Sequence, residues 1–163
     1  GLSLKGFTAE NFEAKADLSY AGLVVFPPWS FSGKGYYHAG GLIDLSPGAS
    51  SPARLVADLD LSRVADRLAN ENLELHYGTA LRTYSGLNTI TVELELINRD
   101  GTSWRTLTVG ETHAAEWRPY AWRTTLPKGT GAARLIISGD VATQNAAIYA
   151  DEVFAYIETS TSR

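Results

Sequence analysis

Hydrophobic and polar residues alternate with a period of two along much of the chain. In NLELHYG (72–78) and TITVELELIN (89–98), apolar side chains occupy every second position and polar ones lie between them. This alternation is typical of antiparallel strands with one face on a core and the other in water. Pro119 indicates an edge position or a bulge, because proline cannot donate to a strand ladder. Further strands are predicted at 53–61, 115–127, 133–140 and 148–158.

Turn-forming residues separate these strands, as in NRDGTS (98–103) and PKGTG (127–131). One short helix is predicted at 62–70, with Ser62 as its N-cap. Many short strands between such turns predict an all-β, antiparallel β-sandwich with at most one short helix. We expect a single domain over residues 1–158 and a loose C-terminal tail over 159–163.

Composition narrows the class of protein. The 163 residues are 44% hydrophobic and 20% charged, which suits one domain with a real core. A net charge of −4 without a basic block argues against nucleic acid as a partner, and no apolar run is long enough to span a membrane. The absence of cysteine excludes disulfides and thiolate sites. Because the chain starts GLSLKG and lacks methionine, we expect a mature form or one module of a larger multidomain protein.

Six fragments occur in an order that is characteristic of one family. They are NFE (11–13), SGKGYYHAG (32–40), DLDLS (58–62), VELELINRDGTSW (92–104), EWRPYAWRTTLP (116–127) and IYADEV (148–153). Together they resemble the galactose-binding-like jelly rolls, and among them the carbohydrate-binding modules of the family 4/9/22 type. The resemblance covers nearly the whole chain. It departs from the family where NFE lacks a preceding Gly-Asp, and where Asp-Glu replaces a pair of aspartates in ADEV.

The resemblance implies a structural calcium ion between the two ends of the chain. Its ligands would be the side chains of Glu13 and Asp151 and a main-chain carbonyl near Lys34. Calcium accepts such a mixture of carboxylate and carbonyl oxygens. Glu152 is expected on the opposite face of the strand, in solvent. The alternative is that Glu13 and Asp151 are ordinary exposed strand charges.

The resemblance also implies a glycan held by exposed aromatic rings. Phe12, Phe26, Phe154 and Tyr77 are predicted to lie in the core or at its boundary, and Tyr120 and Trp122 to be buried. Each remaining aromatic residue either contacts sugar or plugs an end of the sandwich. Polar helpers could come from Arg82, Asn88, Glu93 and Glu95. The candidate sugar-binding residues are Trp29, Tyr36, Tyr84, Trp104 and Trp117.

A concave sheet face is the alternative to a site in the loops. We expect such a face to carry His76, Glu93, Glu95 and Arg134. Because this set contains few aromatic residues, it is poorly equipped to stack a sugar chain. The sequence therefore favours a loop-borne site, or none.

The sequence does not favour an enzyme. It has no G-x-S-x-G element, and His38, His76 and His113 are isolated without zinc spacing. Glu93 and Glu95 share one strand face at about 7 Å, so they flank a glycosidic bond poorly.

Two functions stay open, with a hydrolase as the weakest third. The first is a non-catalytic, extracellular carbohydrate-binding module that binds an oligosaccharide or polysaccharide. The second is a structural or receptor-binding β-sandwich of a larger surface or phage tail protein. The fold alone cannot separate these functions.

Overall fold

The structure is a computed structural model that describes residues 4–10, 13–16, 35–39, 53–83, 86, 89–139 and 148–160. Within these residues, ten strands form two five-stranded antiparallel sheets. The first sheet has the order β1 (Leu4–Glu10), β4 (Ala53–Asp60), β9 (Thr130–Gly139), β6 (Ile90–Asn98) and β7 (Ser103–Thr112). The second has the order β2 (Glu13–Ala16), β3 (Gly35–Ala39), β10 (Ile148–Thr159), β5 (Leu73–Thr83) and β8 (Arg118–Thr125). The predicted β-sandwich is therefore confirmed.

The hydrophobic core lies between the two sheets. Leu73, Leu75 and Tyr77 on β5 are fully buried, while Glu74 and His76 between them remain partly exposed. Strand β6 alternates in the same way, with its apolar residues in the core. The predicted burial of Tyr77 is confirmed, and its hydroxyl shares a 2.8 Å hydrogen bond with that of Thr124. The period-two pattern thus predicts which face of these strands lies inward.

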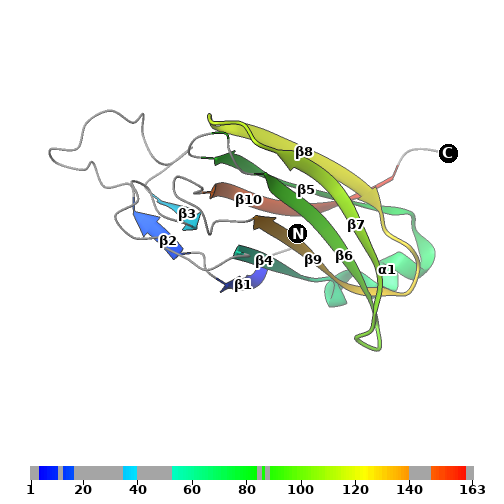
Figure 1. Ribbon diagram of the computed structural model, residues 1–163. Helices are drawn as coiled ribbons and strands as arrows, with labels where there is room; N and C mark the ends of the chain where they lie inside the picture. Colours follow the sequence, from blue (N-terminus) through cyan, green and yellow to red (C-terminus); the bar gives the residue numbers. More distant parts are fainter. Residues whose placement is uncertain are drawn as a thin grey trace, which may run out of the picture.

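One short helical segment closes an end of the sandwich, away from β2 and β3 (Figure 1). It consists of a 3-10 turn, η1 (Ser62–Val64), followed by the helix α1 (Ala65–Asn70). The prediction of Ser62 as N-cap was wrong, because Ser62 is the first residue of the 3-10 turn and Leu61 is its N-cap. The carboxylate of Asp60 accepts the Ser62 backbone N–H at 2.9 Å instead.

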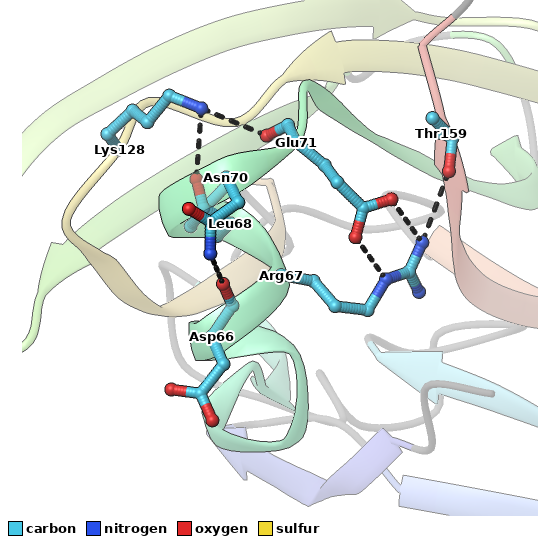
Figure 2. Close-up of polar contacts among 7 residues, drawn as sticks. All are labelled: Asp66, Arg67, Leu68, Asn70, Glu71, Lys128 and Thr159. Atoms are coloured by element: carbon cyan, nitrogen blue, oxygen red, sulfur yellow. Dashed lines mark hydrogen bonds and ion pairs between the residues drawn. The ribbon is translucent and has the colours of Figure 1, made fainter.

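Two side chains, Lys128 and Arg67, connect α1 to the rest of the sandwich by hydrogen bonds (Figure 2). The Lys128 ammonium donates to the carbonyl oxygens of Leu68 and Glu71 at 3.1 and 3.0 Å, which serves acceptors left open at the helix end. The Arg67 guanidinium pairs with Glu71 and also donates to the hydroxyl of Thr159 on β10 at 3.1 Å. Strand β10 therefore remains attached up to Thr159, where the tail was predicted to begin.

The edge strands β7 and β8 are joined across the two sheets. The Tyr120 hydroxyl donates to the hydroxyl of Thr112 at 2.7 Å. The indole of Trp122 packs on the backbone of β7, where a Cβ on Gly110 would lie 2.8 Å from the ring. Tyr120 and Trp122, which were predicted to be buried, pack against the core and are half-buried. The edge position expected from Pro119 is correct, since β8 ends the second sheet.

Both ends of the chain contribute strands to the second sheet. Glu13 on β2 pairs with His38 on β3, and His38 pairs in turn with Tyr149 on β10. The strands that carry Glu13 and Asp151 are therefore separated by one strand. No helix among the described residues is long and apolar enough to cross a membrane.

Candidate functional site

The outer face of the second sheet carries two large exposed rings. Phe154 and Tyr156 on β10 are 38% and 43% exposed, and the described residues include no other exposed large hydrophobic side chain. Their ring centroids are 6.2 Å apart, and the ring planes differ by only 20°. Burying aromatic surface of this kind is a common source of ligand-binding energy. We therefore treat this aromatic pair, Phe154 and Tyr156, as the centre of the candidate site.

A β-bulge turns the aromatic pair outward. Asp151 pairs with Ala80 and Phe154 pairs with Gly78, so β10 uses three residue steps where β5 uses two. Glu152 adopts φ +47°, the only positive φ of a non-glycine residue within the described part of the chain. One extra residue exchanges the two faces of everything that follows it. As a result Val153, Ala155 and Ile157 pack against the core, and Phe154 and Tyr156 do not.

The prediction that Phe154 lies in the core was therefore wrong. Regular alternation from Asp151 would have put Phe154 inside, and the bulge reverses that alternation. Tyr156 is not among the five sugar-binding residues that the sequence predicts. The sequence nevertheless contained a signal that Tyr156 is exposed. Glu152 and Glu158, which are polar, lie an even number of residues from it on the same strand.

Glycine on the neighbouring strand makes room for one ring. A Cβ added to Gly78 would lie 2.7 and 2.8 Å from two carbons of the Phe154 ring, and would also collide with the carbonyl oxygen of Tyr120. The ring of Phe154 therefore rests on the backbone of β5. Such close approach of a ring to the backbone requires glycine.

The second ring has a partner on the same strand, β5. The imidazole of His76 stacks on the ring of Tyr156, with centroids 4.8 Å apart and planes within 9°. The His76 Nε2 atom lies 3.5 Å from a carboxylate oxygen of Glu74 and 3.4 Å from one of Glu158. This nitrogen is buried, and it makes no hydrogen bond within the described residues. The Glu158 side chain is 60% exposed, so its carboxylate can also reach a ligand beside the rings.

The same face is closed farther along β10. Tyr149 is fully buried, with Trp117 edge-on to it at 6.3 Å and the Arg82 guanidinium 5.8 Å from its ring centre. Arg82 donates to the carbonyl oxygen of Ala115 at 2.8 Å. Burial lowers the pKa of Arg82 below its usual value, while the nearby Tyr149 and Glu116 oppose that shift. Arginine nevertheless stays charged at any physiological pH. Because Tyr149 is covered by these side chains, the open part of this face among the described residues is the part around the aromatic pair.

The five predicted sugar-binding residues are placed as follows. Trp117 is half-buried against Tyr149, at the closed part of the face. Tyr36 lies on β3 and Trp104 on β7, but their side chains lie outside what the structure describes. Trp29 and Tyr84 lie outside the described residues, as do Phe12, Phe26 and Asn88.

The predicted polar face does not form one surface. His76 lies on the second sheet, whereas Glu93, Glu95 and Arg134 lie on the outer face of the first. Arg134 donates to Asp58 at 2.8 Å and lies 3.6 Å from Glu95, so charges on that face compensate one another. Because the two outer faces of a sandwich point in opposite directions, Glu93 and Glu95 cannot serve a ligand on the aromatic pair.

Of the predicted calcium ligands, only the side chain of Asp151 lies within the described part of the chain. Asp151 is 8% exposed, and its Oδ1 accepts the backbone N–H of Glu152 at 2.8 Å. Glu152 itself is exposed, as expected. Lys34 and the side chain of Glu13 lie outside the described part. Among the residues that are described, no three acidic or histidine side chains are placed to hold a metal ion.

Solved structures with the same fold include several carbohydrate-binding modules, although no protein-family model and no curated protein sequence matches the chain. The xylan-binding CBM22-1 domain of Paenibacillus barcinonensis Xyn10C superposes with a TM-score of 0.53 at 15% identity, over 96% of this chain and 88% of that one. TmCBM61, solved in complex with β-1,4-galactotriose, superposes with a TM-score of 0.52 at 10% identity, over 95% and 90%. This chain has the fold of these modules.

A phage protein shares the fold as well. The enzymatically active domain of bacteriophage CBA120 tailspike protein 4 superposes with a TM-score of 0.58 at 11% identity. The match covers 96% of this chain but only 20% of that one. The predicted resemblance to carbohydrate-binding modules is thus confirmed for the fold, which phage tail proteins also use.

Proposed function

We propose that the protein is a non-catalytic carbohydrate-binding module that binds glycans on the outer face of its second sheet. The observation that carries this proposal is the exposed aromatic pair, Phe154 and Tyr156. The C–H face of a pyranose packs well on such rings. The exposed carboxylate of Glu158 lies beside the rings, where it can accept hydrogen bonds from sugar hydroxyls.

Neutral β-linked polysaccharides are the first ligands to test. Two modules of the same fold are a xylan-binding domain and a module solved with β-1,4-galactotriose. Trp29, Tyr36, Tyr84, Trp104 and Trp117 remain proposed as further contacts, because each could extend the site beyond the aromatic pair.

Calorimetric titration with xylan and with β-1,4-galactan tests the proposal. We expect Phe154→Ala and Tyr156→Ala each to weaken binding by about 1 kcal/mol, since each loses roughly half of a ring's burial energy. Arg134→Ala on the opposite outer face is the control and should bind as the wild type does. If neither glycan binds, or if both alanine variants bind normally, the aromatic pair is not a glycan site.

A calcium ion joining β2 to β10 is proposed as the structural cofactor. The ligands would be Glu13, a main-chain carbonyl near Lys34 and Asp151. The order β2-β3-β10 and the buried Asp151 carboxylate support this proposal. The ion would supply stability rather than chemistry. Added calcium should therefore raise the unfolding temperature of the EDTA-treated wild type and leave Asp151→Ala unchanged.

A structural or receptor-binding domain of a phage tail protein is the second candidate function. It is favoured by the shared fold of the tailspike domain, in which the matching part is one fifth of the chain. Both candidates place the protein outside the cell within a larger multidomain protein, where polysaccharide surfaces are met. Binding to intact bacterial cells without binding to xylan or galactan would favour the receptor-binding function.

A further inference from the structure

The bulge that turns the aromatic pair outward is held by two specific side chains. At a bulge, the extra residue leaves the strand ladder, so its backbone groups need other partners. The carboxylate of Asp151 accepts the backbone N–H of Glu152 at 2.8 Å. The hydroxyl of Thr79, on β5, donates to the carbonyl oxygens of Asp151 and of its own neighbour Ala80, each at 3.1 Å. Thr79 and Asp151 are 1% and 8% exposed, so water contributes little to these bonds.

We infer that Asp151 and Thr79 are positioning residues for the aromatic pair, Phe154 and Tyr156. They act through the bulge rather than by touching sugar, and the inference rests on the proposed function of the aromatic pair. It also offers a reason for the unusual acidic pair in this strand. Asp151 supplies the acceptor, and Glu152 takes the left-handed conformation that the bulge requires.

The competing arrangement of β10 is a regular strand without the bulge. Regular pairing after Asp151 and Ala80 would set Val153 opposite Gly78 and turn Phe154 into the core. The exposed rings would then be replaced by aliphatic side chains. Left-handed backbone at a non-glycine residue is unfavourable, so the bulge persists only where its surroundings enforce it. The bonds from Asp151 and Thr79 help to enforce it.

Two matched pairs of variants test this inference. Asp151→Asn keeps an oxygen acceptor and Asp151→Ala removes it; Thr79→Ser keeps a hydroxyl and Thr79→Val removes it with little change of shape. Cross-strand NMR contacts between Phe154 and Gly78 report the bulged register without any glycan. The second measurement is the affinity for glycan, with xylan or β-1,4-galactan as the ligand, whichever binds the wild type. It shows whether the aromatic pair still forms a binding surface. All measurements are made in EDTA and repeated with calcium chloride.

We expect Asp151→Asn and Thr79→Ser to keep the Phe154–Gly78 contacts and to bind within about twofold of the wild type, because the backbone partners remain. Asp151→Ala and Thr79→Val should weaken those contacts and lower affinity by up to about thirtyfold, which is the cost of losing both rings at about 1 kcal/mol each. If Asp151→Ala does not fold, Thr79→Val decides the result. If Asp151→Ala and Thr79→Val both keep the Phe154–Gly78 contacts and the affinity of the wild type, the inference is overturned.

Asp151→Asn also separates positioning from metal binding. Loss of the bulged register in Asp151→Asn would overturn the inference, because it would show that the negative charge is needed rather than the acceptor. Failure of the proposed function looks different. In that case the wild type binds neither glycan. The Phe154–Gly78 contacts are nevertheless kept in Asp151→Asn and Thr79→Ser and weakened in Asp151→Ala and Thr79→Val.

Discussion

The ring of Phe154 lies against the backbone of Gly78 on the adjacent strand, so closely that even a methyl group at Gly78 has no room. We expect Gly78→Ala to displace the ring, to lower the free energy of unfolding by about 1–3 kcal/mol, and to weaken glycan binding. A double-mutant cycle with Phe154→Ala measures how much of that cost belongs to this contact. The cost should shrink in the Phe154→Ala background without vanishing, because the Tyr120 carbonyl oxygen also opposes the methyl group. Equal costs in both backgrounds would show that the ring does not rest on Gly78.

The stacking of His76 on Tyr156 should contribute to glycan affinity. His76→Ala removes the ring that holds Tyr156 within 9° of parallel. We expect affinity to fall by about 1 kcal/mol, or roughly fivefold, since the aromatic pair loses its orientation. Titration calorimetry at constant pH measures the change. His113→Ala, at an exposed histidine on another part of the chain, is the matched control. Unchanged affinity in His76→Ala would mean that Tyr156 is oriented by other contacts.

Strain at Glu152 should be removable without loss of the fold. Its φ of +47° is ordinary for glycine but unfavourable for a residue with a Cβ. We expect Glu152→Gly to keep the unfolding midpoint or to raise the free energy of unfolding by up to about 1 kcal/mol. Glu152→Val should lower it by about 1–2 kcal/mol, because a β-branched residue tolerates this conformation least. Chemical denaturation measures both variants. Greater stability in Glu152→Val than in Glu152→Gly would contradict the left-handed assignment.

Tyr77 should make the stability of the protein depend on alkaline pH. Burial raises the pKa of the Tyr77 phenol, and the hydrogen bond from Thr124 opposes this in part. Because the unfolded chain releases this proton at about pH 10, earlier than the folded one, the free energy of unfolding falls as pH rises above that value. Below it the contribution of Tyr77 is fully present.

Denaturant titrations from pH 7 to pH 11 test this dependence. Tyr77→Phe should be less stable at pH 7 by about 1 kcal/mol, since it loses the bond to Thr124, and the difference from wild type should narrow above pH 10. Thr124→Val removes the same bond but retains the phenol, so its curve should still fall at alkaline pH. Parallel curves for Tyr77→Phe and wild type would rule out a buried, titrating Tyr77.

The hydrogen bond between Tyr120 on β8 and Thr112 on β7 should contribute to stability as one coupled interaction. Tyr120→Phe and Thr112→Val each remove the 2.7 Å hydrogen bond between the two hydroxyls. Each should lower the free energy of unfolding by about 1 kcal/mol, and the double variant should cost little more than either one. Thermal unfolding of the four proteins measures the coupling. Full additivity would indicate that the two hydroxyls do not interact.

The sequence by itself determined the class of fold and much of its core. A period of two places Leu73, Leu75 and Tyr77 on one face of β5, and this property depends only on neighbours along the chain. The same holds for the edge position of Pro119, which follows from its missing N–H. The antiparallel sandwich could be predicted for that reason, whereas the family resemblance was based on six short fragments and their order.

Only the tertiary structure decided where the rings of Phe154 and Tyr156 point. Their direction depends on how β10 pairs with β5, where three residue steps face two. At that bulge the carbonyl oxygen of Asp151 accepts a hydrogen bond from Thr79, 72 residues away in the chain, and Glu152 takes a left-handed conformation. Local alternation contains neither the partner strand nor its hydrogen bonds, so it placed Phe154 inside. The candidate site thus arises where long-range pairing overrides the local pattern by a single residue.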